Sequence, residues 1–535
     1  MKREATLKNS FLGRRAVVIG AGLGGLSAAR VLADYFDEVI ILDRDELPDD
    51  GAPRPGVPQG KHPHRLLGGG LKALENLFPG FGNELMRAGA EPMDPGLDML
   101  YEIPGQDVWP RIKLSWPTYS MSRPLIERTL RRQVERIGNI TVRRGCRVLS
   151  IVSEAHVLAA TGIRYETPAG NRKTLESDLI VDGSGNGSLT VEFLKATDRR
   201  PLAETSIGVN TRTASALFER VDVGNGYKGV FTFPDAPEQC RGGLILPAED
   251  NRHQVLLIGR GNDIPPINGD QFMSYAQELP TLTFYNAIKN AKRLTGITPF
   301  SFSESRWRHF AQVPDFPNGL LPIGDAICRF NPAYGQGMTV ALQEANLLFD
   351  LLRTLDGSQL STLAPTFLTK AETLIAAPWA MSAIPDFIYP ETTGERPADL
   401  EDRLNFQRAL GRLAVRDPEV YELLTEIRNL LKPLSLLDDP SIVRRVKEEI
   451  AKGSQGRITQ GGIFQTQQGT WCWTRKVKAK TVTVALSTQQ AELFKQAVAQ
   501  HRKLEVLLAK MRDISQTFLL QSLPGPPRRK RSKPS

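Results

Sequence analysis

The chain has 535 residues, of which 41% are hydrophobic, and a formal net charge of +9 at pH 7. This composition excludes a disordered chain, and the length suggests about two to four domains. No apolar run reaches about 18 residues, and the start lacks a signal-peptide core, so we expect a globular cytoplasmic protein. The four cysteines have no Cys-x-x-Cys spacing, which argues against a metal site or a disulfide framework.

Part of the positive charge lies at the end of the chain, where Arg528-Arg-Lys-Arg-Ser-Lys533 follows a Pro/Gly segment. This composition favours a solvated tail over a nucleic-acid site. We therefore predict a disordered basic tail over 523–535 and no specific nucleic-acid partner. A peripheral membrane contact stays open.

The stretch from residue 16 to residue 43 predicts a strand, a glycine turn, a helix and a second strand. The turn is Gly20-Ala-Gly22-Leu-Gly-Gly25. In a dinucleotide cradle the first glycine permits a tight turn, the second lets amides approach a pyrophosphate, and the third brings the helix close to the sheet. Asp43 ends the second strand, where it can bind ribose hydroxyls. A plain glycine-rich turn is the alternative, but the flanking strands and helix favour the cradle.

A Pro/Gly-rich loop over 53–64 follows, and it carries His62 and His64. No third metal ligand lies nearby in sequence, so we expect polar contacts from these histidines and no metal. Residues 101–116 are predicted as strands with two tryptophans, and residues 139–153 as further strands.

Ser122 begins a predicted helix, because Ser is a good N-cap and Pro124 suits the first turn. Arg123 then lies at a helix N-terminus, against the preference of the helix dipole. Its position is compatible with an anionic neighbour and equally with a solvated surface charge.

Two further strands end in an acid and glycines. Asp182-Gly183 by itself favours a sharp turn, since Asp-Gly is a common turn pair. The later signal is stronger: Gly324 and Asp325 end an apolar strand, and Gly335-Gln336-Gly337-Met338 leads into a helix. Such a carboxylate can bind a ribityl or ribose chain, and amides at a helix N-terminus suit the electron-rich edge of a flavin. The three sites together indicate one long cofactor.

In their order and spacing these motifs resemble the FAD-dependent group A monooxygenases, over about residues 14–440. Within this family, the loop Arg54–His64 and the segment Asn331–Met338 resemble the bacterial branch that includes squalene-type and polyether-forming epoxidases more than they resemble the phenol hydroxylases. The resemblance implies an α/β fold: a Rossmann-like FAD-binding domain of the p-hydroxybenzoate hydroxylase and glutathione reductase type, with an interleaved antiparallel-sheet substrate layer and a C-terminal helical extension.

The resemblance also implies roles for individual residues. Asn186 stands where related sequences often carry an arginine, so a separate flavin reductase stays open as the electron donor. For the adenosine diphosphate half of FAD, the implied residues are Gly20, Gly22 and Gly25 at the pyrophosphate, Asp43 at the ribose with Arg44 beside it, and Val148 at the adenine. Arg123 is implied for the phosphate or ribityl region, and Asp182 and Gly183 for FAD and transient NAD(P)H. The ribityl chain and the flavin are assigned to Gly324, Asp325, Gly335, Gln336, Gly337 and Met338.

The domain boundaries follow from these motifs and from changes in composition. Short apolar runs between 201 and 299 predict antiparallel strands, for which an ordinary structural sheet is the default interpretation. The alternative is a sheet that covers the flavin and forms an apolar pocket, with Trp307, Phe310 and Tyr334 as candidate lining residues. The expected divisions are an FAD-binding monooxygenase-like domain over 14–452, with a cofactor part (14–65, 120–200, 300–365), a substrate layer (66–119, 201–299) and a helical part (366–452), then an added module over 453–522 and the tail.

The added module is predicted to contain a strand at Lys476–Val484 and a helix at Thr488–Leu520. It resembles, faintly, a small bacterial domain of unknown function with a cysteine-bearing hairpin before a long helix. A helix of this kind more often packs or dimerises than binds nucleic acid, so a dimer through it stays open.

The expected function is an FAD-dependent monooxygenase that epoxidises or hydroxylates an apolar small molecule with O2 and NAD(P)H through a flavin hydroperoxide. No catalytic side chain is assigned, because the cofactor carries this chemistry. An FAD-dependent reductase of prenyl-chain double bonds, similar to geranylgeranyl reductases, is the alternative. A non-enzymatic interaction protein is the alternative of another class.

Overall fold

The computed structural model describes residues 11–153, 159–198, 202–355, 357–455, 462–466, 470–477, 480–488, 490–495 and 497–498. The chain divides into two compact units, one formed by 1–404 and 414–438, the other by 405–413 and 439–535. No helix within the described ranges is both long enough and apolar enough to cross a membrane.

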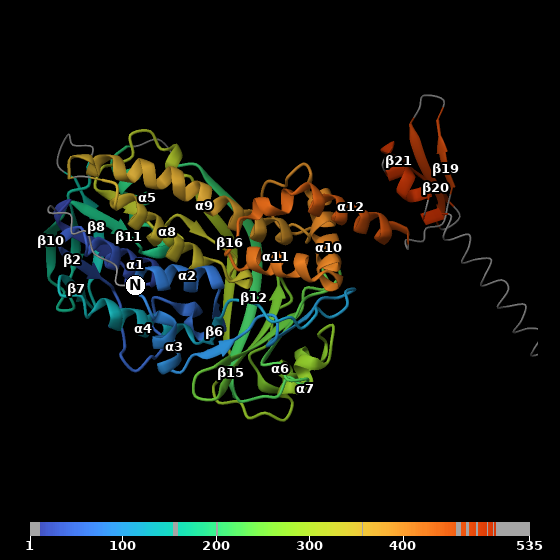
Figure 1. Cartoon of the computed structure of the whole chain (residues 1–535), viewed down its shortest axis with the longest axis horizontal. Coiled ribbons are helices and arrows are strands. Elements are labelled where there is room, and N and C mark those ends of the chain that lie inside the picture. Colours follow the sequence, from blue (N-terminus) through green and yellow to red (C-terminus); the bar gives the residue numbers. More distant parts are fainter. Residues whose placement is uncertain are drawn as a thin grey trace, which may run out of the picture. The chain divides into compact units, whose positions relative to one another are not determined.

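A five-stranded parallel sheet, whose β2, β7 and β11 are labelled at the left of Figure 1, lies in the main core of the larger unit. The second halves of two of its inner strands, Ala16–Ile19 and Val39–Leu42, are buried apolar runs, as expected for a parallel sheet that is covered on both faces. Their order is β17-β11-β1-β2-β7, and all neighbours are parallel, which confirms the predicted Rossmann-like arrangement. The strands are β1 (Gly13–Ile19), β2 (Phe36–Leu42), β7 (Ile140–Arg143), β11 (Leu179–Asp182) and β17 (Leu320–Pro322).

Helices cover this sheet and pack on one another. The predicted cap of α4 is confirmed, since Ser122 Oγ accepts a hydrogen bond from the Leu125 amide at 3.3 Å. The helices that start before residue 340 are α1 (Leu23–Leu32), α2 (Gly68–Leu77), α3 (Phe81–Arg87), α4 (Arg123–Val134), α5 (Leu189–Ala196), α6 (Gly269–Gln277), α7 (Thr283–Ile288) and α8 (Gly337–Leu352).

A seven-stranded sheet forms the second layer of the larger unit, in the order β18-β16-β12-β15-β14-β13-β5. Apart from the parallel pair β13 and β5, its neighbours are antiparallel, which confirms the predicted strands. One face packs on α6 and α7, for example through Phe272 and Phe284 (Figure 1). The strands are β5 (Met99–Glu102), β12 (Glu204–Glu219), β13 (Gly229–Thr232), β14 (Gly242–Ala248), β15 (Arg252–Arg260), β16 (Thr298–Arg308) and β18 (Cys328–Arg329).

Two small sheets complete this unit. The prediction of strands throughout 101–116 is wrong, because the chain leaves the sheet after Glu102 and continues as a loop that carries the two tryptophans. Trp109 is buried and Trp116 is half-buried. The sheets are formed by β3 (His64–Leu66), β6 (Thr118–Met121) and β4 (Glu91–Met93), and by β8 (Arg147–Val152), β9 (Gly162–Glu166) and β10 (Arg172–Glu176).

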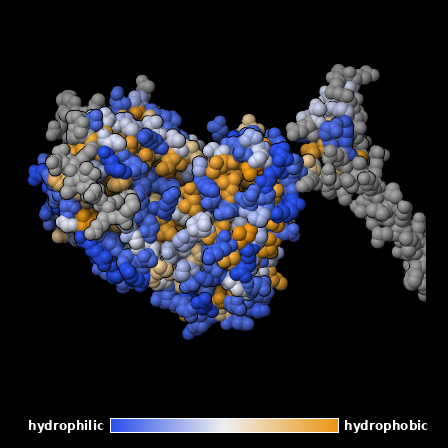
Figure 2. Space-filling model, viewed as in Figure 1, coloured by the Kyte–Doolittle hydropathy of each residue, from blue (hydrophilic) through white to orange (hydrophobic). Residues whose placement is uncertain are grey.

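The later part of the chain is helical, with α9 (Leu363–Asp386), α10 (Leu400–Arg416), α11 (Pro418–Arg428) and α12 (Pro440–Gln455). On the face shown in Figure 2, hydrophilic residues dominate the margins and hydrophobic residues surface only in patches.

The smaller unit contains a three-stranded antiparallel sheet of β19 (Gly462–Gln465), β20 (Trp471–Val477) and β21 (Lys480–Leu486). The prediction of one strand over Lys476–Val484 is therefore wrong, because Lys476 belongs to β20 and Val484 to β21, and these two strands pair antiparallel. Trp473 and Leu486 pack with Ala491 and Val498. From residue 499 onward, the predicted helix and the basic tail lie outside the described residues.

Candidate functional site

The turn between β1 and α1 has the geometry that a phosphate cradle requires. Gly20 has φ +95°, and a Cβ atom there would lie 2.5 Å from the Gly183 carbonyl oxygen. A Cβ atom at Gly25 would lie 2.0 Å from the Gly20 carbonyl oxygen, whereas one at Gly22 would meet nothing within 4 Å. Among the described residues, no side chain caps α1. Uncapped amides therefore face open space at Gly22, which fits a pyrophosphate.

Asp43 lies at the end of β2, as predicted, but the chain itself supplies donors to both of its carboxylate oxygens. The Ala21 amide donates to Oδ2 at 2.7 Å, and the Asp45 amide donates to Oδ1 at 2.9 Å. Arg54 Nη1 donates to both oxygens at 3.2 Å. Asp43 thus closes the glycine turn, while the neighbouring Arg44 is exposed.

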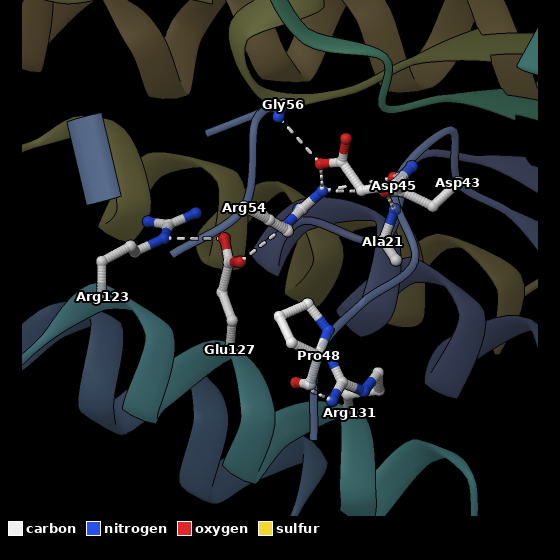
Figure 3. A network of polar contacts seen from close by, with 9 residues as sticks. All are labelled: Ala21, Asp43, Asp45, Pro48, Arg54, Gly56, Arg123, Glu127 and Arg131. Carbon is white, nitrogen blue, oxygen red and sulfur yellow. Dashed lines mark hydrogen bonds and ion pairs between the residues drawn. The ribbon is translucent and has the colours of Figure 1, made fainter. Parts of the chain in front are cut away.

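Arg54 connects this carboxylate to α4 through a buried network of charges (Figure 3). It donates to Asp45 at 2.9 Å and, through Nε, to Glu127 at 3.0 Å. The other oxygen of Glu127 accepts from Arg123 Nε at 2.8 Å. Burial acts to raise the pKa of Glu127, but Arg123 and Arg54 together hold it below its ordinary value. Arg123 therefore has the anionic neighbour that one interpretation of its position required.

Asp182 is the most completely bonded of the three strand-end aspartates. Its carboxylate accepts from the amides of Ser184 and Thr190 at 3.1 and 2.8 Å, and from the hydroxyls of Ser184, Ser188 and Thr190. The side chain is fully buried. Asp182 therefore holds the turn that leads into α5, and Gly183 packs directly on Gly20.

Asp325 differs from these two, because its carboxylate accepts no hydrogen bond from any described residue. It lies beside the start of α8, with Oδ1 3.9 Å from the position of a Cβ atom at Gly337. Burial raises its pKa, and the nearby cations Arg329, Arg123 and Arg308 act in the opposite direction. In the part of the chain that the structure describes, no side chain caps α8. An unpartnered carboxylate and uncapped amides therefore meet at this point.

The glycine turn and the Asp325 motif lie next to each other. A Cβ atom at Gly24 would lie 3.4 Å from Ala341 Cβ in α8 and 3.8 Å from Ile323 Cγ2. Arg308 Nη1 donates to the Ala326 carbonyl at 2.9 Å, and Nη2 to the Asn186 carbonyl at 2.9 Å. The predicted sites therefore converge at one edge of the parallel sheet.

The segment before α8 is anchored by Asp386, at the end of α9. Asn331 Nδ2 donates to this carboxylate at 3.1 and 3.2 Å, and the Tyr334 hydroxyl at 3.3 Å. Arg260, in the larger antiparallel sheet, donates to it at 3.2 Å. Gln336 is buried, and its Oε1 has no hydrogen-bond partner in the described chain.

Several other predicted residues have different surroundings. Phe310 does not line a pocket, because it is buried in the main core against Phe316. Trp307 packs on Trp379, with ring centroids 5.7 Å apart. Val148, the predicted adenine contact, is half-buried in β8 beside a register shift.

Both loop histidines make polar contacts, as expected. His62 Nδ1 lies 2.6 Å from Ser215 Oγ, and His64 Nδ1 lies 2.8 Å from the His62 carbonyl. Burial lowers the pKa of each to about 4. Among the described residues, no group of three or more His, Cys, Asp or Glu side chains could hold a metal ion.

Sequence reasoning missed Arg54, Glu127, Arg308 and Asp386. Of these, only Glu127 had a signal in the sequence: it follows Arg123 by four residues on a predicted helix, a spacing that favours an ion pair.

The chain matches the family model described as FAD binding domain over residues 111–377. Protein Rv3254 of Mycobacterium tuberculosis is 30% identical over 445 residues, which cover 80% of this chain and 92% of that protein. Squalene epoxidase 1 of Arabidopsis thaliana is 23% identical over 374 residues, which cover 66% of this chain and 62% of the epoxidase. The chain thus spans less than two thirds of the epoxidase.

Solved structures show the same fold. A triple mutant of the flavin-dependent brominase Bmp2 superposes with a TM-score of 0.56 at 13% identity, over 82% of this chain and 99% of the brominase. Together with the cradle geometry and the relatives, these matches show that the chain belongs to the FAD-binding family of flavoprotein monooxygenases and is an FAD-dependent oxidoreductase.

Proposed function

We propose that this protein hydroxylates or epoxidises an apolar small molecule, with O2 as the oxidant and NAD(P)H as the source of electrons. The observation that carries the proposal is the unpartnered Asp325 carboxylate beside the uncapped start of α8, next to an open glycine cradle. The likeness to squalene epoxidase 1 favours epoxidation of an alkene.

The residues present fit FAD. The amides after Gly22 would hold the pyrophosphate, since the start of a helix favours negative charge. Arg123, whose Nε is bonded to Glu127 and whose charge acts on Asp325, would face the phosphate or ribityl region. Asp325 would accept hydrogen bonds from ribityl hydroxyls. The first amides of α8 would face the electron-rich edge of the flavin ring.

When bound, reduced FAD activates O2 for transfer of one oxygen atom to a substrate carbon. The protein's part is to orient the substrate and to exclude water. Asp386 serves orientation, because it fixes the segment before α8 to the larger antiparallel sheet through Asn331, Tyr334 and Arg260. The face of that sheet opposite α6 and α7 contacts the cofactor part through Ser215 and His62.

Oxygen dependence tests the proposal. Purified protein would be reduced with NADH or NADPH and mixed under isotopically labelled O2 with a hydrocarbon alkene (squalene) and, separately, with an unsaturated fatty acid (oleate), and the products analysed by mass spectrometry. We expect one labelled oxygen atom in the product and no turnover without oxygen. Turnover that continues without oxygen and saturates a double bond would instead identify a reductase and overturn the proposal.

A further inference from the structure

A cluster of aromatic rings lies between the larger antiparallel sheet and α11. Trp109 packs against Tyr101 of β5 and Tyr421 of α11, with ring centroids 5.6 Å apart in each pair. Trp109 is only 6% exposed, yet its Nε1 donor has no hydrogen-bond partner among the described residues. A buried N–H group without an acceptor destabilises the folded protein, and a ligand that supplies an acceptor removes this free-energy penalty.

Two arginines converge on this cluster, and neither has a carboxylate partner in the described part of the chain. The Arg428 guanidinium lies 5.0 Å from the centre of the Trp109 ring. Arg65 Nη1 donates to the Tyr101 hydroxyl at 3.2 Å. Elsewhere in the larger unit, buried arginines such as Arg54 and Arg260 are matched by acids. Arg65 and Arg428 therefore form an unbalanced positive site.

Arg428 is exposed and Arg65 is half-buried, so both guanidinium groups are accessible to a ligand. Arg428 lies over the Trp109 ring and has no anion beside it in the described chain. An anion that contacts both arginines and the buried Trp109 is less screened by water than an anion at a single exposed arginine.

A purely structural explanation is that Arg428 ends α11, where the helix dipole favours a cation. Arg353 provides the comparison, because it follows the last residue of α8, lies 5.5 Å from the Phe349 ring centre and, like Arg428, is exposed. The dipole does not account for Arg65, which lies in β3.

The cluster is connected to the candidate cofactor site by the chain that follows Arg65. A Cβ atom at Gly335 would lie 4.0 Å from Leu67 Cδ2, and one at Gly70 would lie 2.7 Å from Thr339 Oγ1 in α8. Tyr101 also packs with Phe231 and Leu244, which are half-buried on the sheet face opposite α6 and α7. A ligand between the cluster and α8 would thus lie along an apolar face.

We propose that Arg428 and Arg65 bind an anionic group of the substrate, a carboxylate in the simplest case, so that the substrate is an apolar acid whose body lies along this face. Trp109 Nε1 supplies a further hydrogen bond to the same group. This inference rests on the proposed function and specifies its substrate class.

The test uses the FAD-loaded full chain and calorimetric titration with matched acids and amides: 2-naphthoate and 2-naphthamide, phenylacetate and phenylacetamide, dodecanoate and dodecanamide. We expect at least one acid to bind about tenfold or more tightly than its amide, as for one charge-assisted contact. Arg428→Gln should abolish that preference, and Arg428→Lys should retain part of it. The matched control Arg353→Gln should leave it unchanged.

FAD content, measured from the absorbance spectrum before each titration, separates the two proposals. A chain that holds no FAD contradicts the proposed function. A chain that holds FAD but binds no acid more tightly than its amide overturns the anion site alone. The anion site is also overturned if Arg428→Gln keeps the full preference for the acid while its thermal unfolding matches that of Arg353→Gln.

Discussion

Asp43 and Asp182 differ sharply from Asp325, although all three follow apolar strands at the same edge of the parallel sheet. The chain's own amides, hydroxyls and Arg54 occupy the first two carboxylates. Asp325 is also surrounded by protein, yet it accepts no hydrogen bond from a described residue. The first two aspartates build the cradle, whereas the third is left for a ligand. The same sequence pattern therefore serves two purposes, and the available donors decide which.

The largest expected effect on stability comes from adding a Cβ atom at the most crowded glycine of the cradle. Gly25→Ala places a Cβ atom 2.0 Å from a backbone oxygen, which cannot move away cheaply. We expect a loss of about 3 kcal/mol of stability. Gly22→Ala meets nothing within 4 Å, so its stability should change by less than about 0.5 kcal/mol. Chemical denaturation of both apoproteins measures the difference, and equal stabilities would contradict the cradle geometry.

Asparagine at the two kinds of aspartate sharpens the comparison. Asp182→Asn replaces an acceptor oxygen with a donor amide where five donors converge, so we expect about 2 kcal/mol of destabilisation. Asp325→Asn removes no bond within the described chain and should leave apoprotein stability nearly unchanged while weakening FAD binding about tenfold. Thermal unfolding and FAD titration provide the two readouts. A loss of stability in Asp325→Asn without one in Asp182→Asn would contradict the distinction between the two kinds of aspartate.

The stability of the protein should depend on pH through Glu344, which contacts the Gly324–Asp325 motif. It accepts from the Gly324 amide at 2.6 Å, and burial raises its pKa to about 8. Between its unfolded value, about 4.3, and pH 8, the native state binds a proton that the unfolded state lacks, so this residue's contribution to stability falls as pH rises.

Glu344→Gln cannot ionise, so its stability relative to wild type should improve by about 4 kcal/mol between pH 5 and pH 9. Unfolding curves of both proteins at several pH values measure this difference. A constant difference across that range would show that Glu344 titrates normally.

The smallest expected effect belongs to the exposed pair of Arg30 and Asp34 on α1, at 2.8 Å. Arg30→Ala should change stability by about 0.5 kcal/mol or less, because water screens the pair. Thermal unfolding beside Gly25→Ala would check this. A loss as large as that of Gly25→Ala would mean that stability does not reside in the cradle contacts.

The sequence was sufficient for features that depend on local pattern. The Gly20 turn, the cap at Ser122 and the strand before Asp325 each have signals within a few residues. It was insufficient where partners lie far apart, as in the pairs Arg54 with Glu127 and Asn331 with Asp386. The hydrophobic pattern also could not show that the donors around Asp182 would saturate it, because those bonds depend on the path of the following turn.

In the proposed arrangement FAD lies between the glycine turn and Asp325, and competitive titration with FAD and ADP tests this placement most directly. ADP contains the pyrophosphate and adenosine but no ribityl chain. We predict that Gly22→Val weakens both ligands about tenfold or more, whereas Asp325→Ala weakens FAD alone. Equal FAD affinity in wild type and Asp325→Ala, or no FAD binding by the wild-type chain, would contradict the account.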